Sequence, residues 1–186
     1  AFETLEQSLP YKHLIKAVGL DSSEKGNPPS KFQKVFEASV KEGYIPVAHA
    51  GEEGPAEYIW EALDLLKISR IDHGNNCLTD EVLLKKLVDE KIALTVCPLS
   101  NLELRVVDDL KDHPLKKMLN LGLKATVNSD DPAYFGGYMN ANFLQTAEAL
   151  DLTKEDVKTL VKNSFEYSLL SDDEKQKYLI QVENFE

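Results

Sequence analysis

The chain has 186 residues, 32 acidic and 21 basic, which give it a net charge of −11 at pH 7. This length suffices for one domain with a buried core, and the acidic balance argues against nucleic-acid and anionic-membrane partners. No apolar run is long enough to span a bilayer, and the N-terminus lacks the basic-then-apolar layout of a signal peptide. The two cysteines, Cys77 and Cys97, make no disulfide framework, so a reducing, cytoplasmic setting is expected.

The first predicted elements are a strand and a helix. Residues 13–20 form a candidate strand. Ser30 is then expected to open a helix, because Gln33 follows three residues later in a capping-box pattern. Gly43 is expected just after the end of that helix, where glycine is common.

Two further predicted strands each end at a histidine. Residues 44–48 lead to His49, and residues 68–71 lead to His73. Helix-like segments follow both strands, and Thr79 is expected to cap the second of these helices.

The second half of the chain holds two more predicted strands and a helical tail. Residues 92–96 and 123–127 form the strands. The strands near His49, His73 and Asp130 lack clean alternation, as expected for strands covered on both faces. The tail is expected to contain three helices over residues 142–150, 153–165 and 172–182, with Thr153 and Ser171 as caps for the last two.

Polar clusters follow three of the five predicted strands. They comprise residues 49–52, 70–74 and 127–132. In a parallel α/β sheet or barrel, ligands bind at the carboxyl ends of the strands. The pattern therefore predicts an α/β fold with a ligand site at this rim.

The residue types in these clusters suit a hydrolytic metal site. Imidazole binds zinc, and a carboxylate beside a metal-activated water can donate or accept a proton. Taken singly, His49 and His73 could be ordinary strand-end histidines, Glu52 a turn acid, and Asp130–Asp131 a turn before proline. Their recurrence at the same end of successive strands favours the functional interpretation. His13 and His113 are interpreted as structural or solvated.

Four motifs, in this order and at these separations, resemble the adenosine deaminase family of metal-dependent purine deaminases. They are His49-Ala50-Gly51-Glu52, Asp72-His73-Gly74, Cys97-Pro98-Leu99-Ser100-Asn101 and Ser129-Asp130-Asp131-Pro132. Residues 19–24 and 128–137 resemble the microbial branch of the family that acts on adenine. The resemblance covers essentially the whole chain. It implies the C-terminal part of a (β/α)8 TIM barrel, with about five strand–helix units and a helical tail, in a single domain over residues 1–186.

The resemblance also implies residue roles. His49 would be the third histidine ligand of a catalytic zinc, and Asp130 its carboxylate ligand. Glu52 would protonate ring nitrogen 1 of the purine, and His73 would orient and deprotonate the attacking water. Asp131 would hold the substrate through the imidazole part of the purine. The implied reaction is hydrolysis of adenine to hypoxanthine and ammonia, a step of purine salvage.

One departure from the family pattern concerns the metal. The family carries a His-x-His pair on its first barrel strand, whereas no two histidines of this chain are two residues apart. The first three strands are also missing from the pattern. We therefore expect the C-terminal portion of a larger enzyme, which is inactive alone and holds zinc weakly or not at all, because catalytic zinc sites normally have three protein ligands. An incomplete sheet exposes apolar surface and open edges, so self-association or pairing with the missing N-terminal part is expected.

Three alternatives remain open. The substrate could be adenosine or another 6-substituted purine, although Ser23 and residues 98–104 favour free adenine by narrowing the space around it. The chain could be a non-catalytic α/β module whose acidic rim binds a partner or a cation. It could also be another metal hydrolase of the same superfamily, acting on a cyclic amide or a phosphoester. The position of Glu52, suited to protonating a ring nitrogen, argues against that last alternative.

Overall fold

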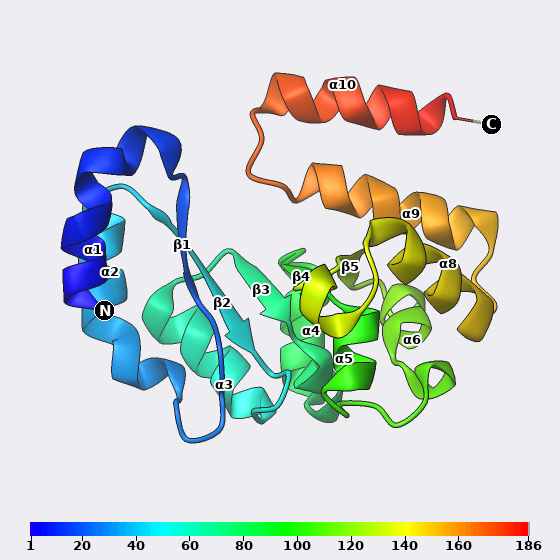
Figure 1. Cartoon of the computed structure of the whole chain (residues 1–186), viewed down its shortest axis with the longest axis horizontal. Helices are drawn as coiled ribbons and strands as arrows, with labels where there is room; N and C mark the ends of the chain where they lie inside the picture. The colour runs from blue at the N-terminus through cyan, green and yellow to red at the C-terminus, as the bar shows by residue number, and fades with distance from the viewer. Residues whose placement is uncertain (186) are drawn as a thin grey trace. The chain divides into compact units, whose positions relative to one another are not determined.

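The structure is a computed structural model and describes residues 1–185. It divides into two compact units, Ala1–Lys86 and Leu87–Glu186. Each unit combines parallel strands with covering helices, as predicted for an α/β chain (Figure 1). The single domain expected over residues 1–186 stays a prediction.

The first unit contains a three-stranded parallel sheet. Its strands, in spatial order, are β1 (Ala17–Leu20), β2 (Ile45–Ala50) and β3 (Arg70–His73). Its helices are α1 (Phe2–Ser8), α2 (Gln33–Lys41) and α3 (Ala56–Glu61), and its short helical segments are η1 (Leu9–Leu14), η2 (Pro29–Phe32), η3 (Ala62–Leu66) and η4 (Asn75–Thr79). Because the strands are parallel, their carboxyl ends meet at one edge of the sheet.

The predicted first strand began too early. Residues 13 and 14 belong to η1, and the strand begins at Ala17. Pro10 stands at the start of η1, where its fixed φ suits the first helical turn.

Two predicted helix starts were also wrong. Ser30 lies within η2, and its backbone N–H donates to Glu61 Oε2 at 2.9 Å, while α2 begins only at Gln33. The helix α4 (Glu81–Asp89) is capped by Asp80 instead of Thr79. Asp80 Oδ1 accepts the first free N–H groups of that helix, and the Thr79 hydroxyl donates back to Asn76 O at 2.7 Å.

The second unit contains the other two strands. They are β4 (Ala93–Val96) and β5 (Lys124–Val127), which pair in parallel with Ala93 opposite Lys124 and Val96 opposite Val127. Its helices are α5 (Pro98–Glu103), α6 (Leu115–Asn120), α7 (Pro132–Phe135), α8 (Met139–Ala149), α9 (Lys154–Glu166) and α10 (Asp172–Glu183), with η5 (Leu110–Asp112) before α6. The sequence patterns did not indicate the short helices α5 and α7.

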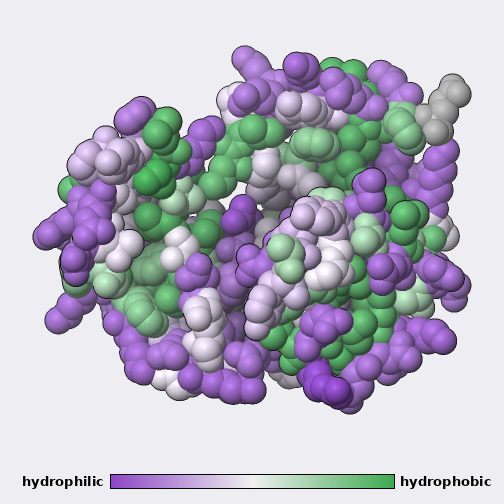
Figure 2. Space-filling view, in the orientation of Figure 1, coloured by the Kyte–Doolittle hydropathy of each residue, from purple (hydrophilic) through white to green (hydrophobic). Residues whose placement is uncertain are grey.

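The helical tail follows the prediction closely. Thr153 and Ser171 each form a capping box, with the Thr153 hydroxyl accepting from Asp156 N at 3.1 Å. α9 packs on β5, where Asn163 Nδ2 donates to Ala125 O at 2.8 Å. α10 runs beside α9, and hydrophobic surface shows between the two helices (Figures 1 and 2).

The strand interiors and inward helix faces supply the buried core. In the first unit this includes Ile59, Leu66 and Ile71, and in the second Leu94 and Leu160. Among residues 1–185, no helix has the combined length and apolar character needed to cross a membrane.

Candidate active site

Three of the predicted site residues meet at the carboxyl edge of the first sheet. His49 lies near the end of β2, Glu52 lies in the loop that follows, and His73 ends β3. Glu52 Oε1 is 3.2 Å from His73 Nδ1, and the imidazole rings of His49 and His73 touch edge to face with centroids 4.5 Å apart. One nitrogen or oxygen from each of the three side chains lies within 4.8 Å of the others.

The backbone at His73 accounts for the contact between the two imidazoles. In the parallel register, His49 pairs with Asp72 and Ala50 pairs with His73. Strict alternation along the strands would therefore place the His49 and His73 side chains on opposite faces. His73 instead has φ +66°, which takes it out of the extended conformation and redirects its side chain. Strained backbone of this kind clusters at functional sites.

The three side chains differ in how much of their surface is exposed to solvent. His73 and Glu52 are 2% and 7% exposed, whereas His49 is half-buried. Their contact therefore lies in a water-poor setting, where charge interactions are strengthened. His49 also faces a pocket of about 260 Å³ that is lined by residues of the turn 20–24 and by Phe32 and Tyr58.

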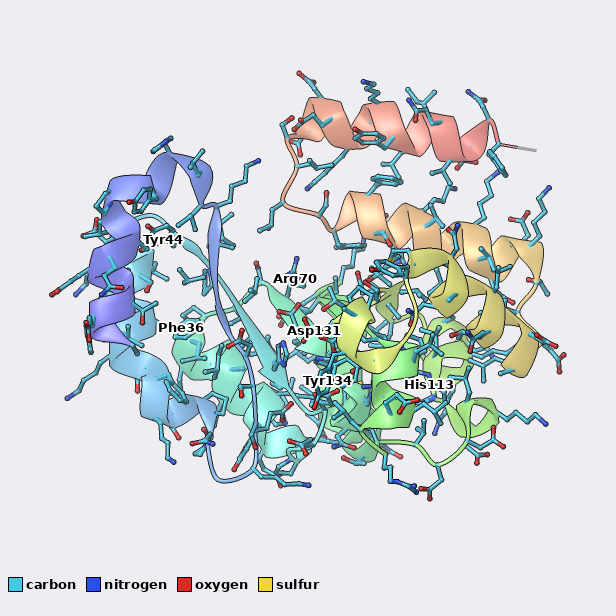
Figure 3. The ribbon with its side chains drawn as sticks, in the orientation of Figure 1. Phe36, Tyr44, Arg70, His113, Asp131 and Tyr134 are labelled. Carbon is cyan, nitrogen blue, oxygen red and sulfur yellow. The ribbon has the colours of Figure 1, made fainter. Side chains whose placement is uncertain are left out.

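The other two predicted residues lie in the second unit, at the turn after β5. Asp130 has φ +55°, again a left-handed conformation in a non-glycine residue. Its Oδ2 accepts a hydrogen bond of 2.8 Å from the hydroxyl of Ser100, which is fully buried. Asp131 precedes α7 and lies near Tyr134, whose side chain is exposed (Figure 3).

The sequence patterns missed the roles of two polar residues. Ser100 was noted only within a motif, and its hydrogen bond orients the Asp130 carboxylate. Glu24 is buried and accepts three backbone N–H groups from the loop that carries Glu52. The partners of Glu24 lie 27 to 30 residues later in the chain, so spacing in the sequence does not identify them.

The remaining histidines fit their predicted lesser roles. His13 is exposed. His113 is buried, accepts the Leu115 N–H at Nδ1 and lies 3.2 Å from Asn101 Oδ1 through Nε2. Since Nδ1 accepts, Nε2 carries the hydrogen and donates to Asn101. Burial lowers the pKa of His113 to about 4, so the ring is neutral at pH 7.

The donor set at the first sheet fits a divalent transition metal. Imidazole nitrogen and carboxylate oxygen are ligands that zinc takes, and the His49, Glu52 and His73 donors are close enough to share one ion. The structure thus supports metal-binding capacity in this cluster, and the individual ligand assignments of His49 and Asp130 stay predictions.

Comparisons with known proteins find deaminases and a zinc-bound amidohydrolase among the proteins similar to this chain. A family model described as adenosine deaminase matches residues 2–185. An adenine deaminase from Acinetobacter baylyi is 59% identical over 98% of this chain and 55% of its own length. The crystal structure of an adenine deaminase from Arthrobacter aurescens has a TM-score of 0.95 and 50% identity, and the match covers 97% of this chain and 55% of that one. An amidohydrolase from Burkholderia ambifaria, solved with bound Zn, has a TM-score of 0.82 and 28% identity over 89% of this chain and 46% of its own.

These matches confirm the predicted fold class, part of an α/β barrel with a helical tail, and the predicted resemblance to the C-terminal portion of the family. The chain spans about 55% of the length of the curated relatives that it matches.

Proposed function

The chain belongs to the adenosine deaminase family, and from this premise we propose that it carries catalytic residues for the hydrolytic deamination of adenine. The observation that carries the proposal is the buried contact between Glu52 and His73 beside His49. A buried carboxylate touching an imidazole is an arrangement suited to moving protons in both directions. The names of the related adenine deaminases support adenine as the substrate.

In the proposed reaction, water adds to carbon 6 of the purine and the carbon–nitrogen bond to the amino group breaks. Glu52 donates a proton to ring nitrogen 1, which makes carbon 6 more electrophilic. His73 orients the attacking water and takes its proton. The amino group leaves as ammonia, so adenine and water give hypoxanthine and ammonia. Asp131 holds the imidazole part of the purine.

We propose that the metal is zinc, held by His49 and Asp130 with further ligands outside this chain. When bound, zinc supplies a water whose pKa is lowered to about 7, so that a nucleophile is available at neutral pH. The donor types at the first sheet support this, and the Zn-bound amidohydrolase provides a precedent in a related protein.

Free adenine is favoured over adenosine by the turn before the pocket. Ser22 has φ +72°, and Ser23 occupies the next position of the pocket wall. The Ser23 side chain takes up space in that wall, which leaves less room for a substrate that carries a ribose. We further propose a cytoplasmic setting, which agrees with two buried cysteines that form no disulfide in the described residues.

The test is a substrate comparison with the full-length form of the protein. Adenine is expected to be hydrolysed with the higher kcat/KM and to release ammonia in equal amount to hypoxanthine. A higher kcat/KM for adenosine would contradict the substrate assignment. Absence of both activities in a folded, zinc-loaded protein would contradict the proposed function.

A further inference from the structure

Glu24 holds the loop that carries Glu52. Its carboxylate is 5% exposed and accepts three backbone N–H groups at 2.9 Å each, from Gly51 and Gly54 at Oε2 and from Glu52 at Oε1. We propose that Glu24 is a positioning residue, which fixes this loop so that the Glu52 side chain stays against His73. The proposal rests on the proposed function for its effect on turnover, but its geometric content does not depend on that function.

The loop needs an acceptor that it does not itself provide. Three N–H groups between Gly51 and Gly54 converge on one carboxylate, a concave arrangement of backbone donors that suits an anion. Each donor would lack a partner without it, and a buried N–H that loses its hydrogen bond is strongly destabilising. The acceptor comes from a turn 27 to 30 residues earlier in the chain, so the loop is shaped by tertiary structure.

The loop is held on its other side by Asn76. Its side-chain Nδ2 donates to Gly54 O at 2.8 Å and to Glu52 O at 3.3 Å, and its backbone N–H donates to Gly51 O at 2.8 Å. Glu24 therefore binds the N–H groups of the loop while Asn76 binds its carbonyl groups. Because both kinds of backbone group are fixed, the direction in which the Glu52 side chain leaves the loop is fixed as well.

The two glycines allow this close approach. A Cβ atom at Gly54 would lie 2.4 Å from Glu24 Oε2 and 2.5 Å from Tyr58 Cδ2, and one at Gly51 would lie 2.5 Å from Ile59 Cδ1. Gly51 also has φ +74°, a conformation that other residues rarely adopt. A side chain at Gly54 would therefore displace the Glu24 carboxylate, and one at Gly51 would displace Ile59 or the loop.

Proton donation depends on this alignment. A displacement of a catalytic group by about 1 Å can lower a rate on the order of 100-fold, and outer-shell changes typically reduce activity by roughly 10- to 100-fold. Glu24 directs both carboxylate oxygens to the loop backbone, and the residue also belongs to the wall of the pocket beside His49. Its removal is therefore expected to lower kcat by a larger factor than it changes KM.

The first test measures turnover of adenine by the full-length form of the protein. Glu24→Ala is expected to lower kcat per folded molecule by roughly 10- to 100-fold, with KM changed less than about threefold. Glu24→Gln is expected to lower kcat on the order of 10-fold, because a carboxamide must turn its NH2 group toward at least one backbone N–H. Glu53→Gln is the matched control, since Glu53 lies in the same loop and forms an outer ion pair with Lys25 at 3.2 Å. The kcat of Glu53→Gln should stay within about twofold of the wild-type value.

The second test follows the loop without any substrate, by amide hydrogen exchange in this chain. In Glu24→Gln the amides of Gly51, Glu52 and Gly54 are expected to exchange at least about tenfold faster, while those of β2 keep their protection. Faster exchange in Glu24→Gln, together with no deaminase activity in the wild-type protein, would support the positioning role and contradict the proposed function. Unchanged exchange in Glu24→Gln, or an unchanged kcat per folded molecule in both variants, would overturn the positioning role.

Discussion

Glu52 and His73 form a buried pair, with Oε1 of the acid 3.2 Å from Nδ1 of the imidazole. The two residues come from different strand–loop segments, so the pair exists only when β2 and β3 are aligned in their parallel register. Any change that weakens this register also separates the acid from its partner. The pair therefore links the folding of the first unit to the proposed proton transfer.

Replacing Glu52 by glutamine is expected to remove the proton donor while preserving the volume of the side chain. Deaminase kcat in the full-length protein should fall by about 100- to 10,000-fold, the range typical of general acid–base catalysis. The measurement is steady-state kinetics with adenine, with far-ultraviolet circular dichroism to verify folding. Glu53→Gln serves again as the control, and turnover in Glu52→Gln close to that of wild type would favour the non-catalytic module.

The 186-residue chain alone is expected to retain little metal. The predicted ligands that it supplies, His49 and Asp130, are fewer than the three protein ligands of an ordinary catalytic zinc site. Metal analysis after zinc loading and dialysis should give well below one zinc per chain, and His49→Ala should lower the residual content further. Stoichiometric zinc that survives dialysis would contradict the prediction and point to Glu52 or His73 as additional ligands.

Stability is expected to fall as the pH falls from about 6.5 toward 4, because of His113. An unfolded histidine has a pKa of about 6.5, whereas burial lowers the pKa of His113 in the fold to about 4. Between these two pKa values the unfolded chain binds more protons than the folded chain. The contribution of His113 to the free energy of unfolding is therefore fully present above pH 6.5 and is lost as the pH falls toward about 4. The loss is on the order of 3 kcal/mol.

Urea unfolding of wild type and His113→Gln, at about pH 7.5 and about pH 4.5, measures this contribution. The variant should be less stable than wild type at the higher pH and should lose less stability on acidification. His13→Gln is the control, because His13 is exposed. An equal acid-induced loss in wild type and His113→Gln would show that another group is responsible.

Self-association of the isolated chain is expected from the apolar surface of its first unit. Leu14, Tyr11 and Phe2 are 74%, 59% and 53% exposed, and a groove of about 280 Å³ lies along β1 and α2. Apolar surface of this kind favours association. Light scattering after size-exclusion chromatography should give a mass above 20.9 kDa that increases with concentration. A monodisperse monomer at all concentrations would rule this out.

The sequence predicted the elements whose signals are local. The Thr153 and Ser171 caps were identified correctly because their capping boxes lie within four residues. The starts at Ser30 and Thr79 were wrong because a tertiary contact or a neighbouring carboxylate competed for the same backbone groups. Ser30 N–H is taken by Glu61, and Asp80 caps α4. Such competition is not visible in spacing alone.

Three residues of the candidate site were identified from the sequence as neighbours, and the roles of all five predicted site residues stay predictions. The two strand-end histidines and Glu52 were expected at the carboxyl edge of the sheet. The structure brings His49, Glu52 and His73 together there. The support for that cluster was not predictable, because Glu24 reaches its partners across 27 to 30 residues. The direction of the His73 side chain was not predictable either. It departs from strand alternation because the backbone at His73 has φ +66°.

The left-handed backbone at His73 lowers stability at a residue whose imidazole the proposed reaction needs. An L-residue other than glycine held at φ +66° costs roughly 1 to 2 kcal/mol. Glycine or asparagine would relieve that cost and remove the imidazole. Directed evolution that selects only for heat resistance therefore has a physical reason to discard this histidine. Under the proposed function, selection for growth on adenine as a nitrogen source has a reason to keep it.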